Sequence, residues 1–345
     1  MRAAIFQEKY QIDVKEVPDP VIQKNTDAIV KVVMACVCGS DLWYYRGIAE
    51  HQQGPIGHEF IGIVEEVGSE VALFAKGDFV ISPFAFSDNT CPHCRVGFHT
   101  ACVNGSFFGM GENNDGGQAE FVRVPFADGT LVKAEGSDFS DDMLASFLTL
   151  SDVMSTGYHA AVSANVKKGG NAVIVGDGAV GLSAVLSAKL LGAEQIIIIS
   201  RHETRQRLAR EWGATHIVEE RGEAGVKVVR AITAGVGADA VMECVGTKES
   251  NEMAFAMARP GAVVGRVGVP HEVVINPNVT FFYNVGMRGG PAPARAYIPN
   301  LLGEVIKGKI NPGKVFDFVT DLDNVSEAYA AMDERRAIKS LIKVS

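Results

Sequence analysis

The sequence predicts an α/β protein of two domains, a mostly β domain and a doubly wound parallel-sheet domain. The chain has 345 residues, which is long for one hydrophobic core. Up to about residue 150 it contains short β-branched or alternating apolar stretches separated by Gly, Pro and Asp. From residue 171, apolar runs alternate with helical stretches, which is typical of parallel strands joined by helices.

The first domain is expected to span 1–152, with 290–345 returning to it. Its strands are predicted in AIVKVVMACVC, FIGIVEEVGSEV, DFVISPF and AEFVRVP. The returning segment NVSEAYAAMDERRAIKSLIKVS is predicted to add a helix and a final strand.

The second domain is expected to span 153–289. The runs NAVIV, QIIIIS, DAVMEC and AVVGRVGV predict buried parallel strands. The stretches AVGLSAVLSAKLLG, ETRQRLAREWG and ESNEMAFAMARPG predict the helices between them.

Composition excludes several classes of function. A net charge of -9 without a basic run argues against nucleic-acid binding. No stretch approaches the roughly 18 apolar residues of a membrane helix, and the N-terminal segment lacks the apolar core of a signal peptide. Six cysteines fit a reducing compartment better than a disulfide framework. We therefore expect a cytoplasmic protein that acts on a small molecule.

The segments Cys38-Gly39-Ser40-Asp41 and Gly57-His58-Glu59 place a thiolate and an imidazole where zinc could use both. Cysteine and histidine are preferred zinc ligands, and a catalytic site needs three protein ligands with one position open. The alternative is a buried apolar cysteine and an ordinary hydrogen-bonded His-Glu pair.

A glycine motif follows the predicted strand NAVIV and opens a helix. In it, Gly176 allows a tight turn, Gly178 lets a pyrophosphate approach the backbone, and Gly181 permits close packing of helix on strand. Between them, Ala179 and Val180 begin the helix, whose free N–H groups attract an anion. The order of strand, motif, helix and strand predicts dinucleotide binding.

The end of the next strand indicates which dinucleotide binds. An NAD site places an acid there to bind the ribose 2'-hydroxyl, but this chain has Ser200-Arg201-His202 and then Arg205. A hydroxyl and cations suit a 2'-phosphate, so the sequence predicts NADP(H) rather than NAD. The alternative is that both arginines are merely the solvated start of a helix.

Together these motifs resemble the zinc-dependent medium-chain alcohol dehydrogenases over essentially the whole chain. The resemblance implies a GroES-like catalytic domain and a Rossmann domain. It also implies that Cys38, His58 and Asp152 hold a catalytic zinc, that Glu59 can approach the metal, and that Thr156 packs against the nicotinamide. The Cys, His, Asp set with the Ser-Arg pair resembles bacterial NADP-dependent secondary alcohol dehydrogenases. For Asp152, the alternative role is a helix N-cap.

The family's structural zinc lobe has four cysteines, and here Cys91, Cys94 and Cys102 occur at its spacing. Asp88 stands where the first cysteine belongs and is the favoured fourth ligand, because carboxylate binds zinc. His93 or His99 could replace it, or the lobe could hold zinc weakly or not at all.

The resemblance assigns Ser40 to the substrate proton. Trp43 occupies the position of a relay histidine found in many relatives, so the relay would end in water or on another group such as His51. Phe84 matches a substrate-pocket aromatic, and Trp43 could line the pocket too, although both could be core residues.

We therefore expect hydride transfer between NADP(H) and an alcohol, ketone or aldehyde, with a secondary alcohol favoured. A zinc-dependent polyol or amino-alcohol dehydrogenase is the nearest alternative. A zinc-free quinone or enone reductase and a non-catalytic NADPH-binding protein are more distant ones. The loops 107–117 and 282–298 would shape the pocket, and the segment 279–287 could form the interface of a homodimer or homotetramer.

Overall fold

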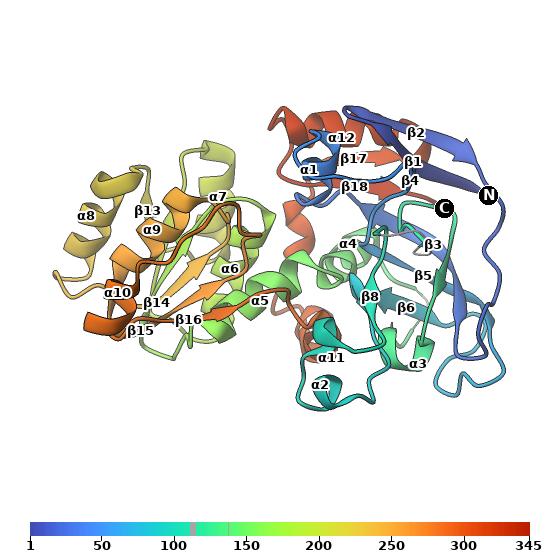
Figure 1. Cartoon of the computed structure of the whole chain (residues 1–345), viewed down its shortest axis with the longest axis horizontal. Helices are drawn as coiled ribbons and strands as arrows, with labels where there is room; N and C mark the ends of the chain where they lie inside the picture. The colour runs from blue at the N-terminus through green and yellow to red at the C-terminus, as the bar shows by residue number, and fades with distance from the viewer. Residues whose placement is uncertain (111–114, 137) are drawn as a thin grey trace. The chain divides into compact units, whose positions relative to one another are not determined.

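The computed structural model describes residues 1–110, 115–136 and 138–345. The chain divides into two compact units: unit 1 comprises Met1–Asp152 and Pro293–Ser345, and unit 2 comprises Val153–Ala292 (Figure 1). Residues 111–114 of the expected pocket loop 107–117 lie outside the described residues. The helices in the described ranges are too short or too polar to cross a bilayer.

Unit 1 contains a mixed sheet ordered β10-β6-β5-β3-β18-β17, with β9 also paired to β3. Its strands are β3 (Ala28–Cys36), β5 (Phe60–Val67), β6 (Phe79–Ser82), β9 (Phe121–Val124), β10 (Val132–Lys133), β17 (Phe318–Asp321) and β18 (Ser340–Lys343). Smaller sheets are formed by β1 (Arg2–Glu8), β2 (Gln11–Glu16) and β4 (Gly54–Pro55), and by β7 (Ala85–Phe86) and β8 (Ser106–Phe107). The predicted strands of this domain are therefore present.

Unit 1 also contains several mostly short helices. They are α1 (Asp41–Tyr45), α2 (Pro92–Arg95), α3 (Ala127–Thr130), α4 (Asp141–Leu150), α11 (Ala294–Ile306) and α12 (Val325–Asp333), with short 3-10 turns at His99–Ala101, Pro312–Val315 and Leu322–Asn324. Ser140 caps α4 by accepting the N–H of Met143, and two acids follow in the first turn, where the helix dipole favours them.

The end of the chain lies inside unit 1. Strand β18 occupies a place between β3 and β17, with Leu341 opposite Cys36. Figure 1 shows these red C-terminal strands beside the blue N-terminal ones. The last strand is therefore adjacent to the strand that leads into the Cys38 motif.

Unit 2 is a parallel sheet ordered β13-β12-β11-β14-β15-β16. The strands are β11 (Asn171–Val175), β12 (Gln195–Ile199), β13 (His216–Val218), β14 (Ala238–Glu243), β15 (Ala258–Arg266) and β16 (Gly286–Gly289). The helices are α5 (Val153–Ser163), α6 (Ala179–Leu190), α7 (Glu203–Trp212), α8 (Gly222–Ile232), α9 (Lys248–Met257) and α10 (Pro277–Phe282). The doubly wound α/β class predicted for this part of the chain is confirmed.

One predicted helix ends earlier than its sequence pattern suggested. The stretch 249–261 was expected to be helical, but α9 ends at Met257 and β15 begins at Ala258. Pro260 disfavours a helical conformation at the residue before it, and Gly261 has a φ of +77°. These two residues therefore stop the helix.

Candidate functional site

Four side chains of unit 1 gather into one potential metal site: Cys38, His58, Glu59 and Asp152. Antiparallel pairing of β3 with β5 places Ala35 opposite Phe60, so the residues just after β3 and just before β5 lie next to each other. Asp152 follows α4, and the adjacent hydroxyl of Ser151 donates to the backbone oxygen of Phe60 at 3.2 Å. Three separate segments thus meet at one point.

The spacing of the ligand atoms fits a tetrahedral zinc site. Sγ of Cys38 and Nε2 of His58 each lie 3.5 Å from Oδ2 of Asp152, and the ligand atoms of the four residues lie within 4.8 Å of one another. Zinc bonds of roughly 2.0–2.3 Å in a tetrahedron separate ligand atoms by roughly 3.3–3.8 Å. The donor set and its geometry therefore fit zinc.

Asp41 fixes the histidine of this cluster. Its Oδ1 lies 3.3 Å from Nδ1 of His58, and its Oδ2 accepts the backbone N–H of Cys38 at 2.9 Å. A carboxylate on one ring nitrogen leaves the other directed at the metal and makes it more basic. Asp41 therefore orients His58 and the start of the Cys38 turn together.

The cluster carries strong internal electrostatic interactions. Burial lowers the pKa of His58, but the charges of Asp41 and Cys38 outweigh burial and raise it well above its usual value. Burial, followed by the charge of Asp152, raises the pKa of Cys38 to about 11. A divalent cation stabilises thiolate and neutral imidazole, which are the ligand forms.

Glu59 faces away from solvent and is bound on both oxygens. Its Oε1 accepts from Nζ of Lys339 at 2.8 Å, and its Oε2 accepts from the thiol of Cys36 at 3.1 Å. Burial lowers the pKa of Lys339, but Cys36 and Glu59 outweigh burial and raise it. Lys339, the residue immediately before β18, therefore holds the glutamate of the Gly-His-Glu motif.

An aromatic wall borders the histidine. The ring of Phe84 contacts the ring of His58 edge-on at 6.3 Å and stacks on Phe107 at 5.9 Å. The backbone N–H of Phe84 donates to Ser151 at 3.0 Å, which ties this wall to the Asp152 segment. The residue expected to line a substrate pocket is therefore beside the metal cluster.

The candidates for proton transfer lie at α1 and just beyond it, and the backbone N–H of Trp43 donates to the backbone oxygen of Ser40 at 3.1 Å. Ser40 precedes α1, and Trp43 lies within this helix, partly exposed. His51 lies beyond α1, with Nδ1 2.5 Å from the backbone oxygen of Gln52 and Nε2 2.8 Å from that of Gly109. Both ring nitrogens of His51 therefore face carbonyl oxygens.

A second potential metal site comprises Asp88, Cys91, Cys94 and Cys102. The two thiol sulfurs of Cys91 and Cys94 are 3.5 Å apart, and the ligand atoms of all four residues lie within 4.8 Å. The backbone N–H of Cys94 lowers the pKa of Cys91 to about 7. The group contains Asp88 rather than His93 or His99, and His99 bonds Asn89 through Nε2 at 2.8 Å.

The glycine motif of unit 2 forms an open turn between β11 and α6. Gly176 has a φ of +113°, and a Cβ on Gly181 would lie 2.0 Å from the backbone oxygen of Gly176. A Cβ on Gly178 would meet no atom within 4 Å. The first and third glycines are thus required for the turn, and the second leaves space for a ligand at the start of α6, beside Ala179 and Val180.

The end of β12 is occupied by polar groups. Ser200 donates to Oδ2 of Asp177 at 2.8 Å, and Nη1 of Arg205 lies 3.1 Å from Oδ1 of the same carboxylate. Arg201 is exposed, and its Nε donates to the backbone oxygen of Glu219 at 3.0 Å. The structure therefore brings Ser200 and Arg205 together through Asp177. Elsewhere in unit 2, Thr156 is buried in α5.

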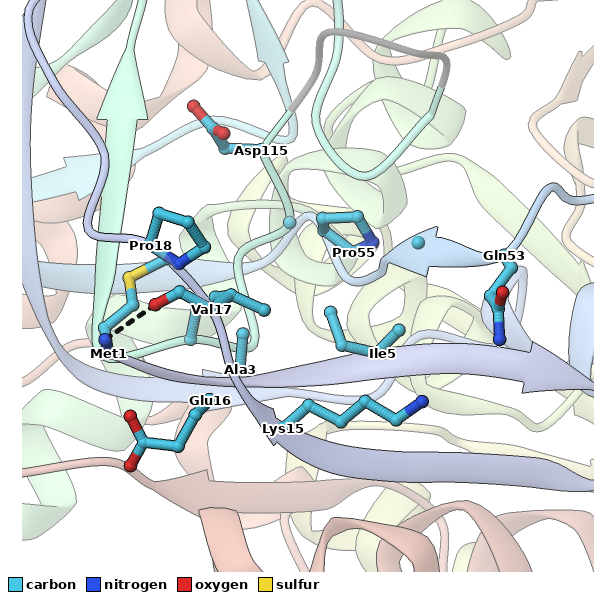
Figure 2. A pocket seen from close by; sticks show the side chains of 13 residues that line it. Met1, Ala3, Ile5, Lys15, Glu16, Val17, Pro18, Gln53, Pro55 and Asp115 are labelled. Carbon is cyan, nitrogen blue, oxygen red and sulfur yellow. Dashed lines mark hydrogen bonds between the residues drawn. The ribbon is translucent and has the colours of Figure 1, made fainter.

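A surface pocket of about 450 Å³ lies away from these residues. Figure 2 shows it lined by Ile5, Val17 and Pro55, with Lys15 and Asp115 at its border. Its lining belongs to the N-terminal sheet and the 115–119 segment, and does not include the residues of either metal cluster. We assign no function to this pocket.

Sequence reasoning missed three polar residues of these sites. Asp41 and Asp177 lie inside the motifs that were recognised, so their position was a usable signal. Lys339 lies just before the short strand β18, 280 residues from Glu59, and no local pattern marks it.

Comparisons with known proteins agree with this geometry. Residues 24–135 match the alcohol dehydrogenase GroES-like domain, and residues 179–306 match the zinc-binding dehydrogenase domain. Zinc-type alcohol dehydrogenase B of Aspergillus flavus is 35% identical over 355 residues, covering 99% of this chain and 81% of that protein.

Two solved structures are similar over nearly their whole length. The alcohol dehydrogenase TADH from Thermus sp. ATN1 has a TM-score of 0.93 and 34% identity, with both chains fully covered. A zinc-binding dehydrogenase from Sinorhizobium meliloti, solved with NADP bound, has a TM-score of 0.83 and 26% identity, covering 99% of this chain and 98% of that one.

The fold and the cysteine-histidine-carboxylate cluster define a zinc-dependent oxidoreductase. The chain belongs to the zinc-dependent medium-chain alcohol dehydrogenase family, with its GroES-like and Rossmann domains. This membership implies zinc and a nicotinamide coenzyme.

Proposed function

We propose that the protein transfers a hydride between NADP(H) and an alcohol, ketone or aldehyde, with secondary alcohols as the preferred substrates. The observation that carries this proposal is the cluster of Cys38, His58 and Asp152 at tetrahedral spacing. NADP(H) is favoured as the coenzyme because Ser200 stands at the end of β12 where an NAD site has an acid, with Arg201 and Arg205 nearby. The relative from Sinorhizobium meliloti supports the same coenzyme.

The proposed mechanism assigns a task to each residue. Bound zinc and the nicotinamide would supply Lewis acidity and the hydride acceptor or donor. Cys38, His58 and Asp152 would hold the metal, and Asp41 keeps Nε2 of His58 directed at it. Ser40 would take the proton of the substrate hydroxyl during oxidation and return it during reduction.

Water is the proposed exit for that proton. A histidine relay needs a ring nitrogen that can accept a proton, but both ring nitrogens of His51 face carbonyl oxygens. Trp43 carries only an N–H donor and cannot accept one. Both observations favour water over the side chains at these positions.

The aromatic wall favours an apolar substrate over a polyol or amino alcohol. Phe84 and Phe107 stack beside His58 and offer no hydrogen bond to additional hydroxyl or amino groups. A buried polar group of the substrate without a partner would bind less well. Phe84 is therefore proposed as a substrate-pocket residue.

The decisive experiment combines metal analysis with turnover. The wild-type protein should oxidise 2-propanol and 2-butanol faster with NADP than with NAD, and faster than sorbitol or threonine. Cys38→Ser should lose about one zinc per chain and nearly all turnover. Cys244→Ser, outside both clusters, is the control for zinc content. Retention of both zinc and full turnover by Cys38→Ser would refute the assignment.

The proposed assembly is a homodimer or homotetramer formed through the edge of unit 2. Strand β16 is the last strand of the sheet, and Phe281, Phe282 and Tyr283 just before it are 77%, 70% and 56% exposed. Large exposed aromatics beside an unpaired sheet edge favour association with a second copy. A cytoplasmic location remains a prediction.

A further inference from the structure

The carboxylate of Asp177 occupies the place where the sequence predicts recognition of a 2'-phosphate. It belongs to the glycine motif between β11 and α6 but reaches the end of the neighbouring strand β12. Only 7% of Asp177 is exposed, and only 1% of Ser200. The carboxylate is therefore a built-in part of this site rather than a solvated surface acid.

Both partners of Asp177 are groups that a 2'-phosphate would need. Ser200 has one hydroxyl proton, and it is donated to Oδ2 of Asp177 at 2.8 Å. Arg205 directs Nη1 to Oδ1 of the same carboxylate at 3.1 Å. A phosphate bound by Ser200 would have to take its hydroxyl proton from Asp177, and a phosphate bound by Arg205 would share the guanidinium with Asp177. In both cases it would lie close to the negative charge of Asp177.

We propose that Asp177 is a specificity-determining residue of the coenzyme site. Its negative charge weakens binding of the 2'-phosphate and thereby reduces the preference for NADP(H) over NAD(H). This inference rests on the proposed function, because it requires a nicotinamide coenzyme at the glycine motif. In other Rossmann domains, an acid at the end of the strand accepts a hydrogen bond from a ribose hydroxyl of NAD(H). The carboxylate of Asp177 offers an acceptor of the same kind. Discrimination between NADP(H) and NAD(H) would thus depend on repulsion by Asp177 as well as on attraction by Ser200 and Arg205.

The test measures binding directly and does not depend on catalysis. ADP-ribose and 2'-phospho-ADP-ribose differ only in the 2'-phosphate, and their affinities are measured by calorimetry on the wild-type protein and on Asp177→Asn. The neutral amide should raise the affinity ratio in favour of 2'-phospho-ADP-ribose by roughly tenfold or more. Asp177→Ser should shift the ratio in the same direction, which covers the case that one variant folds poorly.

Two further variants separate the roles of charge and of Arg205. Glu211→Gln removes one negative charge from the same helix as Arg205, and should leave the ratio unchanged. Arg205→Gln should lower the affinity ratio. Adding it to Asp177→Asn should remove most of the increase that Asp177→Asn causes, because the guanidinium freed from Asp177 is then missing.

The outcomes distinguish this inference from the coenzyme proposal. If the affinity ratio of both Asp177 variants stays within roughly twofold of the wild-type ratio, the inference is overturned while the preference for NADP(H) stands. A wild-type protein that prefers ADP-ribose, with the preference reversed in Asp177→Asn, contradicts the NADP(H) proposal and supports the role of Asp177. Binding of neither nucleotide overturns both.

Discussion

Nζ of Lys339 lies 2.8 Å from Oε1 of Glu59, and the two side chains are 1% and 0% exposed. The pair joins the residue before β18 to the motif that carries His58. A buried charge without its partner is strongly unfavourable, because desolvation is no longer compensated.

Replacing Lys339 by methionine should therefore destabilise the protein by about 3–5 kcal/mol, measured as the free energy of unfolding in urea. Lys343→Met, four residues further on in β18 and at an exposed pair with Asp141, should destabilise the protein by at most about 1 kcal/mol. Adding Glu59→Gln to Lys339→Met should recover part of the loss. Equal effects of the two lysine substitutions would show that the buried pair has no special contribution.

Asp41→Asn should weaken zinc binding at the catalytic cluster by about 10–100-fold, because His58 loses the carboxylate that orients it. The measurement is competition with a chelator, followed by zinc content per chain. Asp78→Asn, which removes an acid that bonds Lys133, serves as the matched control. An unchanged zinc affinity in Asp41→Asn would contradict the orienting role.

The cysteine lobe gives a prediction about its fourth ligand. Asp88→Ala should lose about one zinc per chain and lower the melting temperature, whereas Asp88→Cys should keep the metal. His93→Ala should change neither zinc content nor melting temperature, since Asp88 is the residue grouped with the cysteines. Loss of zinc from His93→Ala with retention in Asp88→Ala would reverse the assignment.

The proposed interface at the edge of unit 2 can be tested by introducing charged side chains into it. Phe281→Glu combined with Phe282→Glu should shift the protein toward the monomer in light scattering after gel filtration, because two buried charges would disfavour the interface. Val319→Glu, at another exposed apolar residue, should not. If the double variant keeps the wild-type mass, the proposed interface is wrong.

Local sequence patterns predicted the parts of the fold that depend on neighbouring residues. The runs of β11 and β12 and the glycine motif were recognisable because strand, turn and helix follow one another in the chain. Strand β13 has three residues, too few to establish an alternating pattern, and it was not singled out.

The contacts that complete the sites could not be predicted in the same way. The bond of Lys339 to Glu59 and that of Asp177 to Ser200 depend on which strands become neighbours in a sheet. Strand order is a property of the whole fold, so no window of sequence contains it. Asp152 was found only through the resemblance to a family, for the same reason.

The position of β18 between β3 and β17 has a consequence for synthesis of the chain. Unit 2 is continuous, and all of its residues leave the ribosome before Lys339 does. Because domains generally fold as units during translation, unit 2 can fold while the sheet of unit 1 still lacks an inner strand. The contact that holds Glu59 beside the other residues of the metal cluster is therefore made only after the whole of unit 2 has been synthesised.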